Sequence, residues 1–142
     1  PQTLQRAPMY RNVVEEVAAY LRTRWQHCLD QGVRPDRLVV DPGFGFGKTL
    51  EHNLQLLEGL GSMRIDDCPI LVGLSRKSML GKLTGRAVDE RTIARVSAAG
   101  IALERGADIV RVHDVAATAD ALQVWQAVAS MSDGSTRKHE HE

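Results

Sequence analysis

The sequence has no excess of charge of either sign, no long apolar run and few cysteines, and each absence excludes a class of protein. Its 18 Lys and Arg residues balance 18 Asp and Glu residues, so we expect no nucleic-acid partner, which would favour a basic excess. No apolar run approaches the ~20 residues that span a bilayer, and the first residues do not resemble a secretory signal. We therefore expect no membrane partner, and any anionic ligand must be bound by a local cluster of side chains.

The two cysteines, Cys28 and Cys68, fit no metal-binding or redox spacing. We expect both thiols to be reduced and buried, as in a cytoplasmic protein. The 142 residues, 43% of them hydrophobic and 25% charged, suffice for one globular domain with a core. The chain opens with Pro1 and not with Met, which favours a piece of a longer protein.

What the sequence does contain is an alternation of amphipathic helices and short apolar strands. Asn12 followed by Glu15 resembles a capping box at the start of a first helix, which Gly32 and Pro35 then end. Apolar runs predict strands at residues 38–40, 70–73 and 109–112. Helical spacing predicts helices over residues 13–29, 49–60, 77–83, 89–105 and 115–131. Residues 132–142 form a polar tail that we expect to be disordered.

The strands are short, rich in Val and Ile, and apolar on both faces, which is typical of parallel sheets covered by helices. Polar and glycine-rich residues follow each strand, and ligand sites of parallel α/β folds lie on that side of the sheet. The fold class is therefore α/β. A closed eight-stranded barrel needs ~250 residues. The pattern fits either a small open α/β sheet or a fragment of a barrel, and periodicity does not choose between them.

Residues 41–49 place three glycines and two aromatic rings directly after the first strand. Pro42 stands where a phosphate-binding P-loop requires glycine, which excludes that motif. Asp41 suits a ligand with paired N–H donors, such as an aminopyrimidine edge, and Phe46 suits a flat aromatic ring. The alternative is a capping aspartate with Phe44 and Phe46 as core residues.

Residues 73–78 follow the second strand and combine two hydroxyls and two cations at the start of a short helix. Exposed N–H groups at a helix start favour anions, so a ligand carboxylate would lie near Ser78. Lys77 would donate to a ring carbonyl or nitrogen and pack its stem on an aromatic ligand. The alternative is a solvated basic cap with no ligand.

Arg111 and His113 end the third strand, and alternation along a strand directs both to the same side of the sheet. A charged side chain in an otherwise apolar strand is costly to bury unless it binds something. The pair predicts a phosphate or pyrophosphate site. The alternative is a structural ion pair of Arg111 with Asp114 or another acid.

In their order and spacing, residues 41–48, 73–78 and 111–114 resemble the last three strand-end motifs of the dihydropteroate synthases. Residues 1–17 are similar to the segment that follows the fifth strand of that family, and the resemblance extends to about Met131. Corrinoid-dependent methyltransferases also bind pterins in barrels, but they do not usually carry these motifs.

The resemblance implies that residues 1–131 are the C-terminal part of a (β/α)8 barrel of the TIM type. They would form about its last three βα units and the helix before them, incomplete as a barrel. The implied reaction joins 6-hydroxymethyl-7,8-dihydropterin pyrophosphate to 4-aminobenzoate in folate biosynthesis, giving 7,8-dihydropteroate and pyrophosphate, with magnesium assisting. Sulfonamides, which mimic 4-aminobenzoate, would bind the same half of the pocket.

The resemblance also assigns roles to residues of this chain. The catalytic residues would be Lys77 and Asp41. The pterin site would comprise Asp41, Gly73, Lys77 and Arg111. The aminobenzoate site would comprise Phe46, Ser75, Lys77 and Ser78. The leaving pyrophosphate would be bound by Arg111 and His113.

The same resemblance implies that half of the site lies outside this chain. The family's first strand, with the Asn tied to magnesium and anion, has no counterpart here, nor do its early mobile loops and the Asp and Asn of its third and fourth strands. We expect no metal ligand in this chain. We also expect no turnover by this chain alone, because donors to a departing pyrophosphate must all be preorganised.

The alternative to an enzyme fragment is a catalytically inactive half-barrel that binds anions or pterin weakly and self-associates. A barrel cut open would expose Val39, Leu71 and Val110 on its interior face, together with a sheet edge. We therefore expect a homodimer, or association with another half-barrel.

Overall fold

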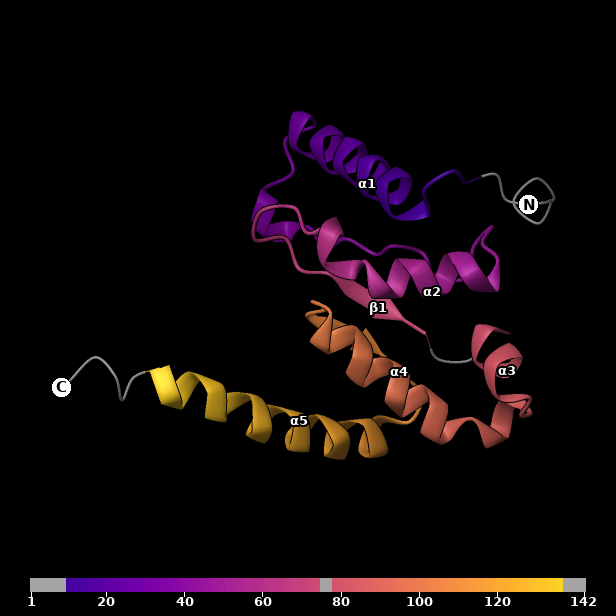
Figure 1. The fold of residues 1–142 in the computed structure, drawn as a ribbon. Coiled ribbons are helices and arrows are strands. Elements are labelled where there is room, and N and C mark those ends of the chain that lie inside the picture. The colour runs from indigo at the N-terminus through magenta and orange to yellow at the C-terminus, as the bar shows by residue number, and fades with distance from the viewer. Residues whose placement is uncertain (1–9, 75–77, 137–142) are drawn as a thin grey trace.

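Residues 10–74 and 78–136 are described by the computed structural model, and over that part of the chain they form an α/β arrangement (Figure 1). The α-helices are α1 Val13–Asp30, α2 Leu50–Glu58, α3 Ser78–Thr84, α4 Thr92–Glu104 and α5 Val115–Thr136. The strands are β1 Leu71–Gly73 and β2 Ile109–Arg111, and the 3₁₀ helices are η2 Pro35–Arg37, η3 Leu60–Met63 and η4 Val88–Glu90. In Figure 1 the helices α1, α2, α4 and α5 succeed one another across the molecule, with β1 running between α2 and α4.

The sheet is parallel, as the sequence predicts. β1 and β2 pair in the register Leu71↔Ile109, Val72↔Val110 and Gly73↔Arg111. The predicted strand at 38–40 is reduced to one parallel bridge between Val40 and Ile70, with the Leu71 N–H donating to the Val40 C=O at 2.8 Å. The next donor in that register would be residue 42, which is a proline without an N–H, so the pairing stops there.

The start of α1 is capped as the sequence predicts, with one difference. Asn12 Oδ1 accepts the Glu15 N–H at 3.2 Å, and the Asn12 N–H donates to Glu16 Oε2 at 3.0 Å. The reciprocal bond of the capping box thus comes from Glu16 and not from Glu15. The helix ends at Asp30, before Gly32, whose φ of 90° is a conformation that glycine adopts without strain.

Three later helices have different ends from those predicted. α2 stops at Glu58, two residues early, because the chain tightens into η3. α4 begins at Thr92 and not at 89, since η4 occupies the preceding turn. α5 continues past Met131 to Thr136, into the predicted tail. Each added residue of a started helix gains a hydrogen bond, so polar residues can extend one.

The core lies on one side of the short sheet. Its largest fully buried side chains are Phe44, Leu56, Leu60, Met63, Ile70 and Val72. The opposite face is open, because Val39 is 48% exposed, Ile109 is 41% exposed and Leu71 is only half-buried. The exposed interior face that the sequence analysis expects at Val39 and Leu71 is therefore present.

The prediction that Val110 lies on the exposed face is wrong. Val110 packs against the core, beside its register partner Val72, which is 1% exposed. Side chains alternate along a strand, so Ile109 and Arg111 take the open face and Val110 takes the covered one. The sequence alone did not fix this parity, because residues 109, 110 and 112 are all apolar.

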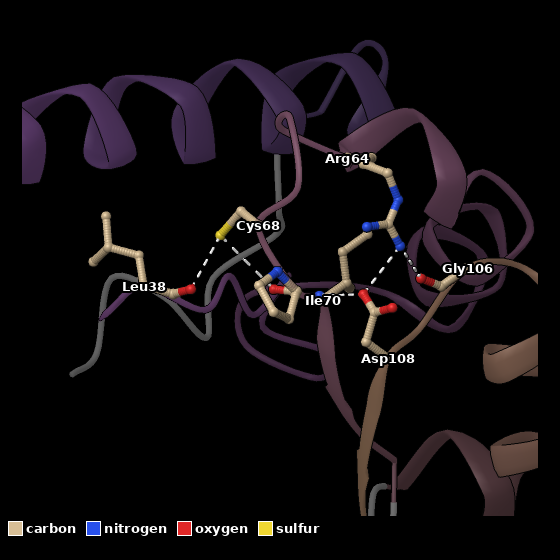
Figure 2. A network of polar contacts seen from close by, with 7 residues as sticks. Leu38, Arg64, Cys68, Ile70, Gly106 and Asp108 are labelled. Carbon is tan, nitrogen blue, oxygen red and sulfur yellow. Dashed lines mark hydrogen bonds and ion pairs between the residues drawn. The ribbon is translucent and has the colours of Figure 1, made fainter. Parts of the chain in front are cut away.

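A polar network ties the amino ends of the parallel segments together (Figure 2). Asp108, which precedes β2, accepts the Ile70 N–H at 2.9 Å and a hydrogen bond from Arg64 Nη2 at 3.0 Å. Arg64 also donates to the Gly106 C=O at 2.7 Å. The hydrogen bond from Ile70, with a smaller contribution from Arg64, lowers the pKa of the Asp108 carboxyl. The network fixes where β1 and β2 begin relative to each other.

Both cysteines are free thiols, as predicted. Cys68 is buried and its Sγ donates to the Leu38 C=O at 3.3 Å (Figure 2), and burial raises the pKa of this thiol. Cys28 is only half-buried on α1, so the expectation of burial is wrong for that residue. Over residues 10–74 and 78–136, no helix is both long and apolar enough to cross a membrane.

Candidate functional site

The first predicted cluster forms a tight loop directly after Val40. Gly43, Gly45 and Gly47 have φ of 75°, 87° and 60°, a region in which a Cβ is strained. Asp41 Oδ1 accepts the Gly43 N–H at 2.8 Å, which turns the chain back at the strand end. The glycines are therefore required by the backbone of the loop itself.

Lys48, which the sequence analysis did not single out, closes this loop from within. Its Nζ donates to the Gly43 C=O at 2.8 Å and to the Phe46 C=O at 3.0 Å. Burial lowers the pKa of the Lys48 ammonium, and the nearby Asp41 carboxylate partly opposes that effect. Lys48 thus fixes the backbone that carries Phe46.

Asn53 on α2 is a second residue that the sequence analysis missed. It is 3% exposed, its Oδ1 accepts the Gly45 N–H at 2.8 Å and its Nδ2 donates to the Thr49 C=O at 2.9 Å. Buried amides are retained where they satisfy backbone groups. A polar residue among the apolar positions of an amphipathic helix is the sequence signal that would have identified it.

The two rings of the loop have different environments. Phe44 is 1% exposed and belongs to the core, whereas Phe46 is 63% exposed. The alternative that both rings are core residues therefore holds for Phe44 alone. Asp41, Phe46 and Lys48 line a cavity of ≈ 500 Å³ together with Tyr10 and residues of α1. A cavity of this size is typical of sites for small organic molecules.

The second predicted cluster is described only at its two ends. Gly73 is buried at the end of β1, and Ser78 is exposed at the start of α3. Ser75 and Lys77 lie outside the described residues. The structure therefore places the ends of this segment at the carboxyl end of β1, on the same side as Asp41.

The third predicted cluster contacts the second across the two strands of the sheet. Arg111 is the register partner of Gly73, and a Cβ added to Gly73 would lie 2.9 Å from Nη2 and 3.2 Å from Nε of Arg111. Contacts that short displace one of the partners, so the absence of a side chain at Gly73 makes room for the guanidinium. His113 is exposed, two residues beyond the end of β2.

Asp114 pairs with Arg95 of α4, so the ion pair considered for Arg111 goes to another arginine. Arg95 Nε donates to Asp114 Oδ2, and Arg95 Nη2 donates to Asp114 Oδ1 at 3.2 Å. The hydrogen bonds from Arg95 lower the pKa of the Asp114 carboxyl, and Asp114 in turn raises the pKa of Arg95. Arg95 was not predicted from the sequence, although a cation on the otherwise apolar helix 92–104 is a signal of a paired side chain.

The described site residues thus fall into two groups. Asp41 and Phe46 share the cavity beside α1, and Gly73 and Arg111 touch across the sheet. Both groups lie at the carboxyl ends of neighbouring parallel segments, where ligand sites of such sheets form. A carboxylate suits paired N–H donors, an exposed ring suits an aromatic ligand, and a guanidinium suits an oxyanion.

Known proteins share much of this sequence. A family model described as "Pterin binding enzyme" matches residues 1–113. Dihydropteroate synthase from Haemophilus influenzae is 49% identical over 130 residues, which cover 92% of this chain and 47% of that protein. The Escherichia coli protein of the same name is 42% identical over 133 residues, covering 94% of this chain and 47% of that protein. The chain spans about half the length of the curated relatives it matches.

Solved structures agree with the sequence matches. Burkholderia cenocepacia dihydropteroate synthase complexed with 7,8-dihydropteroate matches with a TM-score of 0.87 at 49% identity, covering 94% of this chain and 51% of that chain. Yersinia pestis dihydropteroate synthase in a sulfonamide drug complex matches with a TM-score of 0.87 at 39% identity, covering 91% and 47%. The α/β arrangement of this chain is therefore similar to about half of those proteins.

Proposed function

This chain belongs to the pterin binding enzyme family, and we propose that it forms the C-terminal half of a dihydropteroate synthase. The whole enzyme would condense 6-hydroxymethyl-7,8-dihydropterin pyrophosphate with 4-aminobenzoate, giving 7,8-dihydropteroate and pyrophosphate. The chain would supply about the last three βα units of a (β/α)8 barrel and the helix before them. Because it holds only part of the site, the chain alone would be inactive.

The observation that carries the proposal is the contact of Arg111 with Gly73 at the strand ends. An arginine on the open face of a sheet, lying over a glycine, offers its guanidinium to an anion. Asp41 ends the neighbouring parallel segment. A pterin with its pyrophosphate requires these two features at once, a hydrogen-bond acceptor for its aminopyrimidine edge and cations for its leaving group.

The substrates would be divided among these residues. Asp41 and Lys77 would hold the pterin ring with Gly73 and Arg111 beside it. The aminobenzoate would lie against Phe46, Ser75, Lys77 and Ser78, where sulfonamides would compete with it. Its amine attacks the pterin methylene carbon, so that a C–N bond forms while the C–O bond to pyrophosphate breaks and the amine proton passes to water. Arg111 and His113 would stabilise the charge on the departing pyrophosphate.

The described part of the chain contains no cluster of typical metal ligands. Over residues 10–74 and 78–136, no group of three or more His, Cys, Asp or Glu side chains could hold a metal ion. The described residues therefore offer no preformed cluster of three such ligands for the ion that the resemblance implies. In the proposed whole enzyme its ligand would come from the part of the relatives that this chain does not match.

The proposed enzyme would be cytoplasmic and would work as an assembly. The open sheet face, with Val39 48% and Ile109 41% exposed, supports association with the complementary half of a barrel or with a second copy of the chain. The same observation favours the alternative function, a catalytically inactive half-barrel that binds anions or pterin weakly and self-associates.

A chimera tests the proposed function directly. Joining this chain to the part of the Haemophilus influenzae relative that it does not match would rebuild a full-length protein. We expect it to form 7,8-dihydropteroate from the two substrates, and we expect Asp41→Asn to lower kcat/KM by about 100-fold. Glu104→Gln, an exposed change on α4, should leave the rate unchanged. A folded chimera that forms no product would contradict the proposal in favour of the inactive half-barrel.

A further inference from the structure

An acidic residue, Asp114, adjoins the proposed pyrophosphate site and interacts electrostatically with His113. Asp114 directly follows His113 and lies three residues after Arg111. Hydrogen bonds from Arg95 lower the pKa of its carboxyl, so it is ionised near neutral pH. An unpaired carboxylate at this point would repel a pyrophosphate bound by Arg111 and His113. The position therefore needs a means of compensating that charge.

The compensation comes from α4, an element that does not belong to the strand-end motifs. Arg95 is 8% exposed, and its Nε and Nη2 donate to the two carboxylate oxygens of Asp114 in a bidentate pair. Thr92 Oγ1 lies 3.4 Å from the Asp114 carboxylate and 3.2 Å from Arg95 Nη2. A bidentate pair holds the carboxylate in one orientation and also neutralises its charge.

The same guanidinium also connects the turn after β2 to the chain before α4. Arg95 Nη1 donates to the Val88 C=O in η4 at 2.6 Å. On the other side, the Asp114 C=O accepts the Thr118 N–H at 2.9 Å in the first turn of α5. Arg95 also lines a small crevice together with Val72 and Val110, whose side chains face the core. The turn that carries His113 is thus fixed from two elements at once.

We propose that Arg95 is a positioning residue of the anion site, which neutralises Asp114 and holds it away from the oxyanion that Arg111 and His113 bind. The inference rests on the proposed pyrophosphate site, and it adds a role for a helix residue outside the three motifs. With Arg95 in place, the strand end presents a net positive charge, since the charges of Arg95 and Asp114 cancel. Without Arg95, the Asp114 carboxylate would offset the guanidinium of Arg111.

Titration of inorganic pyrophosphate into the chain by calorimetry tests the inference. We expect Arg95→Met to weaken pyrophosphate binding by roughly tenfold at low salt, and by less at high salt, because the lost interaction is electrostatic. Adding Asp114→Asn to Arg95→Met should restore most of the affinity, since the charge that required compensation is then absent. Arg105→Met is the matched control, because Arg105 follows the same helix and forms an exposed ion pair with Glu58 at 3.6 Å.

Asp114→Asn alone separates charge compensation from a purely structural role, and it keeps an amide oxygen that Arg95 can bind. Charge compensation predicts pyrophosphate affinity equal to or higher than that of the wild type. A purely structural ion pair predicts weaker binding by Asp114→Asn and no rescue in the double variant, and either result would overturn the inference. If the wild-type chain binds no pyrophosphate, the proposed anion site fails and the inference fails with it. If it binds and Arg95→Met binds equally well, the inference alone fails.

Discussion

The guanidinium of Arg111 lies over Gly73, its register partner in the parallel sheet, so closely that a Cβ on Gly73 would approach Nη2 to 2.9 Å. Gly73 has an ordinary negative φ, so the glycine is explained by space and not by backbone conformation. The position and freedom of the guanidinium therefore depend on a residue that contributes no side chain.

Gly73→Ala should displace the Arg111 guanidinium and lower its affinity for an oxyanion. We expect pyrophosphate affinity, measured by calorimetry, to fall by about tenfold, approaching the loss caused by Arg111→Ala itself. The control is Gly100→Ala on α4, where a Cβ would meet nothing within 4 Å. That change should leave binding intact and raise stability by ~0.5–1 kcal/mol, because alanine favours helix. Equal binding by wild type and Arg111→Ala would refute the anion site.

Asn53→Leu should destabilise the loop of residues 41–49. The substitution removes the acceptor of the Gly45 N–H and one of the two hydrogen bonds to the Thr49 C=O, which keeps its bond from the backbone N–H of residue 53. A net hydrogen bond contributes ~0.5–1.5 kcal/mol. Urea denaturation followed by circular dichroism would measure the loss. Gln55→Leu, an exposed change on the same helix, should alter the midpoint little. Equal effects from the two variants would show that Asn53 does not hold the loop.

The acid limb of the stability profile should depend on Asp108. Its folded-state pKa is lowered from the ordinary value of 3.8, first by the Ile70 N–H and then by Arg64. A lowered carboxyl pKa stabilises the fold above about pH 4, and that contribution is lost as the pH falls through the folded-state value. We expect Asp108→Asn to flatten the fall in thermal midpoint at acid pH. Asp67→Asn, a change at an exposed aspartate, is the control and should not alter how the thermal midpoint depends on pH. If Asp108→Asn also leaves that dependence unaltered, Asp108 does not stabilise the fold in the way described.

The chain should associate through its open sheet face. Sedimentation at micromolar concentration should give a species larger than 15.6 kDa, since Val39 and Ile109 expose apolar surface there. Val39→Lys should shift the equilibrium towards monomer. Val33→Lys replaces a valine that is 38% exposed elsewhere and should have no such effect. A compact wild-type monomer would rule out this association.

Much of the local structure could be predicted from the sequence. The cap at Asn12, the stop before Gly32 and the parallel segments at 40, 71–73 and 109–111 depend on short-range signals that a window of residues contains. Helix ends were less predictable, because 3₁₀ turns at η3 and η4 compete with the same residues for helical hydrogen bonds.

The sequence by itself determined the alternation of helices and strands, the glycine loop after Val40 and the order of the polar clusters, because periodicity and turn chemistry are local. Only the tertiary structure decided which of Phe44 and Phe46 is buried, which face Val110 takes and which arginine pairs with Asp114. Those outcomes depend on contacts between residues far apart in the chain. Arg95 and Asp114 are 19 positions apart and meet because α4 packs beside β2. No local pattern encodes that distance.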